Sequence, residues 1–235
     1  KEAFLDSELK KHRNLTSANS INIARLIPQS FYYFHAMAQM PKTVKPVVFS
    51  VPSGNYGNLS AGLMAKQMGL KFDKMLACSN VNKIVPDYLS KGVFDPQPSQ
   101  MTISNAMDVG NPSNFARMSN WYEGSVDHMR EEIAGYWFDD DVTRASLKEV
   151  YEQKNYLMDP HGTIGYLGLK EYQQHNDVDG IFLETAHPAK FIDVVEETIS
   201  ESIEIPARLK ACLDQQKSAI ELKADFEELK QFLLS

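Results

Sequence analysis

The chain has 235 residues, of which 43% are hydrophobic and 23% are charged, a composition typical of a globular protein that can bury a core. Its net charge of −7 disfavours nucleic acid as a partner and gives no attraction to anionic membranes, and no apolar run is long enough to span a bilayer. Cys78 and Cys212 form no spacing motif, so we expect buried or partly buried thiols in a reducing cytoplasm.

Residues 1–46 are predicted to form a helical lead-in. The apolar spacing of residues 1–13 indicates an amphipathic helix, and because this pattern is already under way at the first residue, we expect a piece of a longer protein. A second helix is expected over residues 21–40, with Pro28 as an interior kink or a new start. The aromatic residues at positions 31–34 surround this helix, which predicts deep burial.

Residues 47–69 have the pattern of a buried strand, a turn and a helix. The β-branched run 47–51 is followed by the polar, glycine-interrupted segment 52–58, and helical spacing then continues to a predicted stop at Gly69. The first turn of a helix leaves backbone N–H groups unpaired and carries partial positive charge. The segment therefore predicts a site for a phosphate.

Two glycines favour this interpretation. Gly54 and Gly57 lack a Cβ atom, so a ligand can approach the backbone and positive φ angles cost little. The segment is neither a Walker A loop nor a G-x-G-x-x-G fingerprint. The alternative is a tight strand-to-helix turn with an Asn cap.

The rest of the chain alternates strands and helices. Residues 74–78 form a second predicted strand, and a helix follows to about residue 90, which makes a parallel sheet the expected core. Asn111 and Pro112 are predicted as N-cap and first residue of the next helix. Arg117 then lies one turn inside, where it meets an anion or is solvated.

Acidic and histidine residues occur at two further helix starts. Asp139, Asp140 and Asp141 are predicted to stabilise the start of a helix over residues 142–154 rather than to bind metal. An Asp-Pro turn before His161 opens the following helix, and His161 lies near the cleft or has only a packing or capping role.

The last strand is expected at residues 180–185, also buried, with Pro188 beginning the next helix. Terminal helices are predicted at 206–213 and 223–233. The predicted domains are therefore a lead-in at 1–46, an α/β domain at 47–205 and carboxy-terminal helices at 206–235. Because ligands of open α/β sheets lie beyond the carboxyl ends of strands, the turns after residues 51 and 185 can meet at one ligand.

Four segments carry a family resemblance. SGNYGN (53–58) resembles the phosphate-binding loop of pyridoxal-phosphate enzymes of the tryptophan synthase β type, known as fold type II. The longer stretch PSGNYGNLSAGLMAKQMGL is similar to threonine synthases, and so are NSINIARL (19–26), SNAMDVGNPSN (104–114) and ETAHPAKF (184–191). The resemblance implies an open parallel sheet with helices on both faces, here incomplete.

The resemblance implies pyridoxal 5′-phosphate as cofactor. Its phosphate is assigned to the strand-to-helix turn, and the hydroxyl of Thr185 is assigned to its pyridine nitrogen. The turn residues are Ser53, Gly54, Asn55, Tyr56, Gly57 and Asn58. Substrate-side candidates are Asn19, Ser20, Asn22, Asn111, Arg117, His161 and Lys190; for the first three, helix capping is the equal alternative.

The implied activity is that of threonine synthase, which converts O-phospho-L-homoserine and water to L-threonine and phosphate. The lysine that attaches the cofactor covalently belongs, in this family, to a segment upstream of everything present here. Lys190 resembles the lysine of the HPAKF segment and not that one, so no catalytic lysine is assigned. We expect the chain alone to be inactive and to depend on an upstream domain of the same protein.

Three alternatives remain open at this point. Another pyridoxal-phosphate lyase of the same fold, such as a serine/threonine dehydratase, shares the phosphate turn, but the resemblance at 104–114 and 184–191 argues against it. The others are a non-catalytic domain that binds a phosphate ligand and a paralogue that has lost catalysis.

Overall fold

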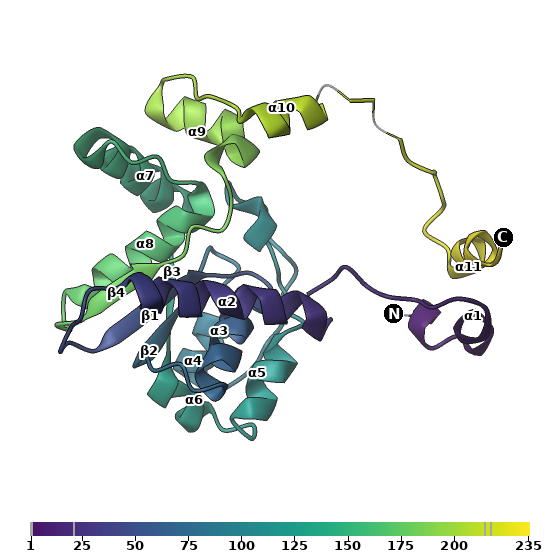
Figure 1. Cartoon of the computed structure of the whole chain (residues 1–235), viewed down its shortest axis with the longest axis horizontal. Coiled ribbons are helices and arrows are strands. Elements are labelled where there is room, and N and C mark those ends of the chain that lie inside the picture. The colour runs from purple at the N-terminus through teal and green to yellow at the C-terminus, as the bar shows by residue number, and fades with distance from the viewer. Residues whose placement is uncertain (1, 21, 214, 217) are drawn as a thin grey trace. The chain divides into compact units, whose positions relative to one another are not determined.

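The computed structural model describes residues 2–20, 22–213, 215–216 and 218–235 (Figure 1). Lys1 and Ile21, where the two predicted amino-terminal helices begin, lie outside the described residues. By their contacts the residues form two units, Ser20–Glu204 and a second that joins Lys1–Asn19 to Ile205–Ser235. The predicted domain limits at residues 46 and 205 stay predictions.

The larger unit contains a parallel sheet. The strands of this sheet follow the order β3-β2-β1-β4, and every neighbouring pair is parallel. Their bounds are β1 (Val47–Pro52), β2 (Lys74–Ser79), β3 (Ile133–Trp137) and β4 (Asp179–Phe182). β1 and β2 lie in the middle of the sheet and are almost completely buried, as their continuous apolar runs predict.

Helices cover both faces of the sheet, which confirms the predicted fold class (Figure 1). Val48, Leu76 and Cys78 pack against α8 (Pro160–Gln173) on one face. On the other face Phe49, Val51 and Met75 pack against α3 (Gly57–Gln67) and α4 (Ile84–Lys91). Successive strand residues point to opposite faces, so one strand supplies both cores.

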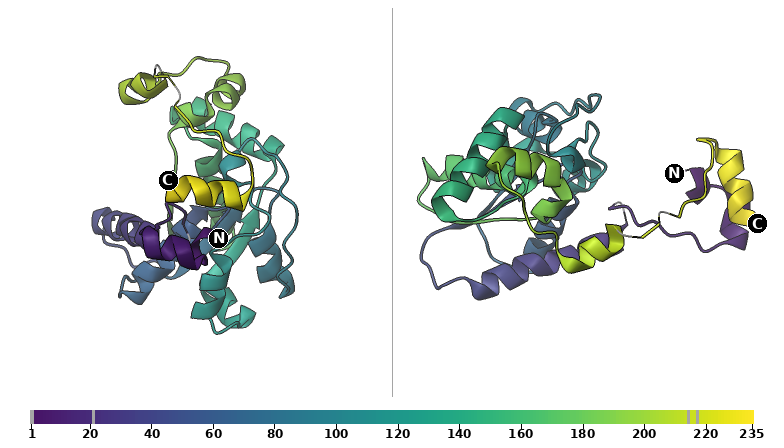
Figure 2. Two further views of the ribbon diagram at one scale, coloured as in Figure 1. Left: turned by 90° about the vertical axis from the view of Figure 1, so that its right-hand side faces the viewer. Right: turned by 90° about the horizontal axis from the view of Figure 1, so that it is seen from above.

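The remaining helices of this unit surround these layers. α2 (Ile23–Gln39) packs on α3 and runs through Pro28 without a break (Figure 2). The others are η2 (Asn105–Met107), α5 (Phe115–Trp121), α6 (Val126–Glu132), α7 (Asp140–Lys154), η3 (Pro188–Phe191) and α9 (Ile192–Ile199). None of the described helices is both long and apolar enough to cross a membrane.

The smaller unit consists of η1 (Glu2–Phe4), α1 (Ser7–His12), α10 (Ala207–Leu213) and α11 (Phe226–Leu234). Lys230 on α11 lies 2.9 Å from carboxylate oxygens of both Asp6 and Glu8, and Arg13 donates to the carbonyl of Leu233. These bonds join the two ends of the chain. The predicted helix over residues 1–13 is shorter because Asp6 caps α1 instead of continuing a helix.

One helix start confirms its predicted cap, and another helix opens at the predicted Asp-Pro turn. The Asp139 carboxylate accepts from the backbone N–H of Val142 at 2.9 Å, and Asp159 precedes Pro160 as the cap of α8. The predicted cap at Asn111 is wrong, because α5 begins three residues later than expected, after Asn114. Asn114 is held there by bonds to Ser20 and to the carbonyl of Asn55.

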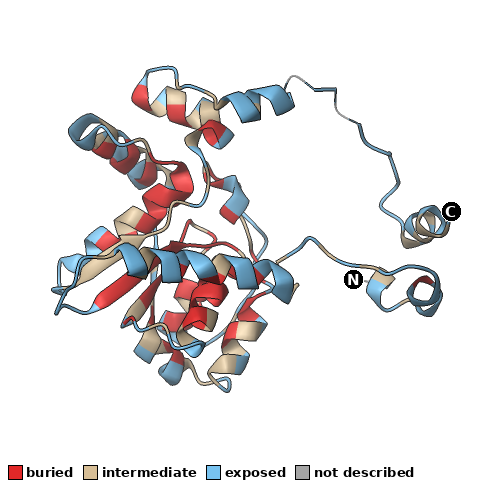
Figure 3. Cartoon of the chain, in the orientation of Figure 1, coloured by how far each residue is buried: buried red, intermediate tan, exposed pale blue. Residues whose placement is uncertain are grey.

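Burial departs from prediction on α2. Tyr33 is fully buried against α3, but Phe31, Tyr32 and Phe34 are 60%, 66% and 36% exposed. Consecutive helix positions are about 100° apart, so a helix that packs on one side buries only one of them. Figure 3 shows α3 largely buried and α2 largely exposed. Cys212 on α10 is also exposed, which contradicts the predicted burial of both thiols.

The edge strands were the least predictable. β3 was not predicted, because its exposure alternates and it contains Gly135, so its five residues resemble no buried strand. β4 ends at Phe182, not at residue 185, and is half-buried rather than buried, since among the described strands it pairs with β1 alone.

Candidate functional site

A pocket of about 760 Å³ opens beyond the carboxyl ends of β1 and β4. The chain leaves β1 for β2 on one side and returns to β4 on the other, so these neighbours mark the point where strand order reverses. The pocket is lined by residues 52–58 from the end of β1 onward, by residues 183–185 after β4, and by α2 between residues 24 and 33. The convergence predicted for the turns after residues 51 and 185 is therefore present.

The β1–α3 segment (residues 53–58) presents backbone donors to this pocket. In the part of the chain that the structure describes, the N–H groups of residues 54–58 donate to no protein acceptor, whereas those of Ser53, Leu59 and Ser60 do. Tyr56, the residue before α3, has φ 59° and no side-chain cap bond. Its side chain is buried, and its hydroxyl bonds to that of Ser79. A run of five unpaired N–H groups at a helix start fits a phosphate group.

One part of the role predicted for the two glycines of this segment, the positive φ angle, is wrong. Neither Gly54 nor Gly57 has a positive φ; the left-handed residue is Tyr56. A Cβ atom on Gly54 would lie 2.6 Å from the backbone of Met107, and one on Gly57 would lie 3.1 Å from the Cβ of Ser20. Glycine is needed at both positions because Met107 and Ser20 of the same chain pack directly against this segment and leave little room for a side chain.

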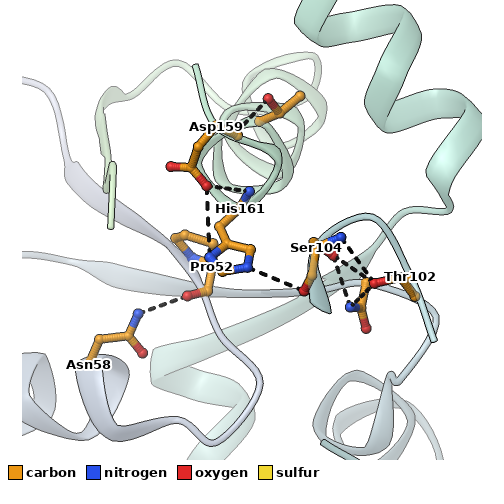
Figure 4. Close-up of polar contacts among 8 residues, drawn as sticks. Pro52, Asn58, Thr102, Ser104, Asp159 and His161 are labelled. Carbon is orange, nitrogen blue, oxygen red and sulfur yellow. Dashed lines mark hydrogen bonds and ion pairs between the residues drawn. The ribbon is translucent and has the colours of Figure 1, made fainter. Parts of the chain in front are cut away.

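The polar side chains of the segment bond within the protein. Ser53 donates its hydroxyl to Asn58 at 2.6 Å, and the Asn58 amide donates to the carbonyl of Pro52 at 2.7 Å (Figure 4). Asn55 donates to the hydroxyl of Ser20 and accepts from the backbone N–H of Ser113. These bonds hold the segment in shape and leave the backbone N–H groups for a ligand.

His161 lines the pocket at the start of α8. Its Nε2 lies 3.2 Å from the carbonyl oxygen of Ser104 (Figure 4). Its ring meets that of Phe191 edge-on, at 4.7 Å between centroids. Burial lowers the pKa of His161, so the ring is neutral at pH 7. His161 therefore both packs against Phe191 and lies at the pocket, so the two predicted alternatives are present together.

The β4 side of the pocket contains Glu184, Thr185 and Lys190. Thr185 follows the end of β4 by three residues and is exposed at the pocket. Burial and the neighbouring Asp159 raise the pKa of Glu184 to about 9. This side therefore presents a hydroxyl, a cation and a carboxyl group with unusual proton affinity.

The pocket brings together only part of the predicted substrate-side set. Ser20, His161 and Lys190 line it, whereas Asn22, Asn111 and Arg117 do not. Asn22 caps α2 by accepting from the N–H of Ala24 at 3.1 Å, and Asn111 is exposed elsewhere. Asn19 belongs to the other unit of the chain.

Sequence reasoning missed several residues of the pocket, among them Arg25, Gln29, Tyr32 and Glu184. Arg25 lies in the first turn of α2, in the NSINIARL stretch itself. Its positive charge, in a segment already expected to line the cofactor site, could have marked Arg25 as a ligand for an anion. The signal for Glu184 is its place directly before Thr185.

The comparisons with known proteins match this chain to threonine synthases. The family model described as "Threonine synthase, C-terminal" matches residues 163–233. The threonine synthases of Haemophilus influenzae and Escherichia coli are 42% and 40% identical over all of this chain. The crystal structure of the E. coli protein superposes on 99% of the chain with a TM-score of 0.89.

The chain is therefore similar to threonine synthases along its whole length. It spans about half the length of the curated relatives it matches, 54% of the E. coli protein and 55% of that from H. influenzae. A structure described as pyridoxal-phosphate-bound threonine synthase from Brucella melitensis is 28% identical, with a TM-score of 0.86 over 99% of this chain and 55% of its own.

Proposed function

We propose that this chain is the carboxy-terminal part of a threonine synthase that converts O-phospho-L-homoserine and water to L-threonine and phosphate. Pyridoxal 5′-phosphate is the cofactor in this proposal, and the pocket beyond β1 and β4 is its site. The observation that carries it is the run of unpaired N–H groups at residues 54–58, which a phosphate dianion would satisfy. We place the enzyme in the cytoplasm, which its unpaired Cys78 and Cys212 support.

The pocket residues fit both ends of this cofactor. In the proposal, residues 53–58 bind its phosphate through the backbone, with Tyr56 and Gly57 at the start of α3. The hydroxyl of Thr185, across the pocket, bonds to its pyridine nitrogen. A neutral hydroxyl there leaves the ring less fully protonated than a carboxylate would.

The substrate brings a second phosphate and a carboxylate. Arg25 on α2 and Lys190 on η3 supply positive charge to the same pocket, and Ser20 and His161 supply hydrogen-bonding groups. We propose that these residues bind and orient the anionic substrate beside the cofactor. Bound pyridoxal phosphate supplies the electron sink for the reaction.

No residue of this chain is proposed to attach the cofactor covalently. Lys190 is the only lysine among the described residues that line the pocket, and its ammonium group lies 5.3 Å from the ring centroid of Phe191. We place the attaching lysine in the part of the relatives that this chain does not match.

The test uses the full-length protein that contains this chain, with pyridoxal phosphate added. We expect inorganic phosphate and L-threonine to appear in equal amounts from O-phospho-L-homoserine. Formation of a keto acid and ammonia from L-serine or L-threonine, without turnover of the phosphorylated substrate, would establish the dehydratase alternative instead.

A further inference from the structure

Glu184 lines the β4 side of the pocket, and its carboxyl group interacts with that of Asp159 behind it. Asp159 caps α8 and is fully buried, and Glu184 lies between β4 and Thr185. The Glu184 carboxyl group lies against the backbone of α8 at Gly162, where a Cβ atom would overlap it. The absence of a side chain at Gly162 lets Glu184 come this close to the cap of α8.

The hydrogen bonds around the two groups are incomplete. Asp159 Oδ1 accepts from the backbone N–H of His161 at 2.8 Å, but Asp159 Oδ2 is buried and has no donor among the described residues. Glu184 Oε1 is buried too, and no described residue donates to it. Ionised carboxylates only accept, so two of them cannot satisfy one another. If the two groups share one proton, the protonated carboxyl group donates its O–H to the other, and each group then has a hydrogen bond to its partner.

Other titratable groups surround the pair. On α8, Nδ1 of His161 lies 3.8 Å from Asp159 Oδ1, too far for a hydrogen bond, and burial keeps that ring neutral. Tyr156, in the segment before α8, has a pKa raised by burial and then by Glu184 and Asp159. Lys190 on η3 lines the same pocket, and its charge contributes to lowering the pKa of His161. Of these neighbours, Lys190 is the one with a cationic side chain.

We propose that Asp159 and Glu184 hold a single proton between them, and that this proton keeps the β4 side of the pocket receptive to anionic ligands. The second half of this inference rests on the proposed function, because it takes the ligand to be a phosphate ester. Loss of the proton would add one negative charge beside Thr185. Anion binding and protonation of the pair are therefore linked, each favouring the other.

The first experiment tests the shared proton without a ligand. Infrared spectra of the full-length protein should show the carbonyl stretch of a protonated carboxylic acid at neutral pH, and E184Q should lack it. The folding equilibrium should also weaken with rising pH by about tenfold per unit between the ordinary glutamate pKa of 4.5 and about 9, since the unfolded chain releases this proton first. In E184Q this dependence should be absent.

Two variants serve as controls for the first experiment. Asp159→Asn keeps a capping oxygen for α8 and gives Glu184 an amide donor, so the protein folds even where E184Q does not. E152Q changes an exposed glutamate on α7 outside the pocket and should keep the wild-type spectrum and pH dependence. Absence of the protonated-carboxyl band, or the same pH slope in E184Q as in wild type, would overturn the shared proton.

The second experiment tests its consequence for binding. With pyridoxal phosphate as probe, E184Q should bind up to about tenfold more tightly than wild type at about pH 10, one unit above the raised pKa of Glu184, and equally well at about pH 6, because only the wild type gains a charge. Pyridoxal, which lacks the phosphate, should show a smaller difference. Equal affinities at both pH values would overturn the link to anions, whereas failure of both proteins to bind either probe would reject the proposed function instead.

Discussion

The two sides of the pocket use opposite chemistry. On the β1 side, residues 54–58 present backbone N–H groups, and the side chains of Ser53, Asn55 and Asn58 bond within the protein. On the β4 side, the groups that face the pocket are the side chains of Glu184, Thr185 and Lys190. Backbone donors keep one charge and one position, whereas side chains titrate and turn. The β1 side is thus suited to hold a constant anion, and the β4 side to adjust the rest of the ligand.

The largest effect is expected from Gly54→Ala. The added Cβ would lie 2.6 Å from backbone atoms of Met107, which cannot turn aside as a side chain does. We expect a loss of about 3 kcal/mol in the free energy of unfolding, at the upper end of overpacking costs. Gly57→Ala, whose Cβ would meet a side chain at 3.1 Å, should cost less. Chemical denaturation compares the two, and an equal cost for both would contradict the packing role.

Asn58→Ala should show that the β1 side recognises phosphate. The change removes the acceptor of the Ser53 hydroxyl and the donor to the Pro52 carbonyl, at a cost of about 2 kcal/mol in stability. The N–H groups of the segment then lose their fixed directions. Affinity for pyridoxal phosphate should fall more than affinity for pyridoxal, as titration of both ligands would measure. Equal losses for the two ligands would make the segment a structural turn only.

Thr185→Val should show the reverse selectivity. This residue is exposed at the pocket and supports no described core contact, so stability should stay nearly unchanged. Loss of one neutral hydrogen bond to the pyridine nitrogen should weaken pyridoxal phosphate and pyridoxal equally, by about 1 kcal/mol. Thr185→Ser, which keeps the hydroxyl, should bind both as the wild type does. A loss confined to the phosphorylated ligand would place Thr185 on the phosphate instead.

The smallest effect is expected from Asn111→Ala. Asn111 is exposed, lies outside the pocket and does not cap α5. Changes at such surface positions stay within about 0.5 kcal/mol. Unfolding and ligand titration should both match the wild type. A clear loss of affinity would return Asn111 to the substrate side, where the sequence interpretation had put it.

The sequence alone determined the structural features that depend only on residues close by in the sequence. The runs of β1 and β2 are apolar throughout because both faces of a central strand are buried, so their composition identifies them. Asp139 and Asp159 bond to N–H groups two or three residues away, so their capping roles are also local. The succession of strand, polar turn and helix at residues 47–69 is local too, and it located the β1 side of the pocket.

Tertiary structure decided what distant segments do to one another. Gly54 must be glycine because of Met107, Tyr33 is the one fully buried residue of the four aromatic residues at positions 31–34, and the register of β3 depends on pairing with β2. The proton affinity of Glu184 arises in the same way, since burial and a carboxyl group 25 positions earlier in the chain both act on it. Desolvation and charge interactions depend on distance in space, which no local pattern of residues encodes.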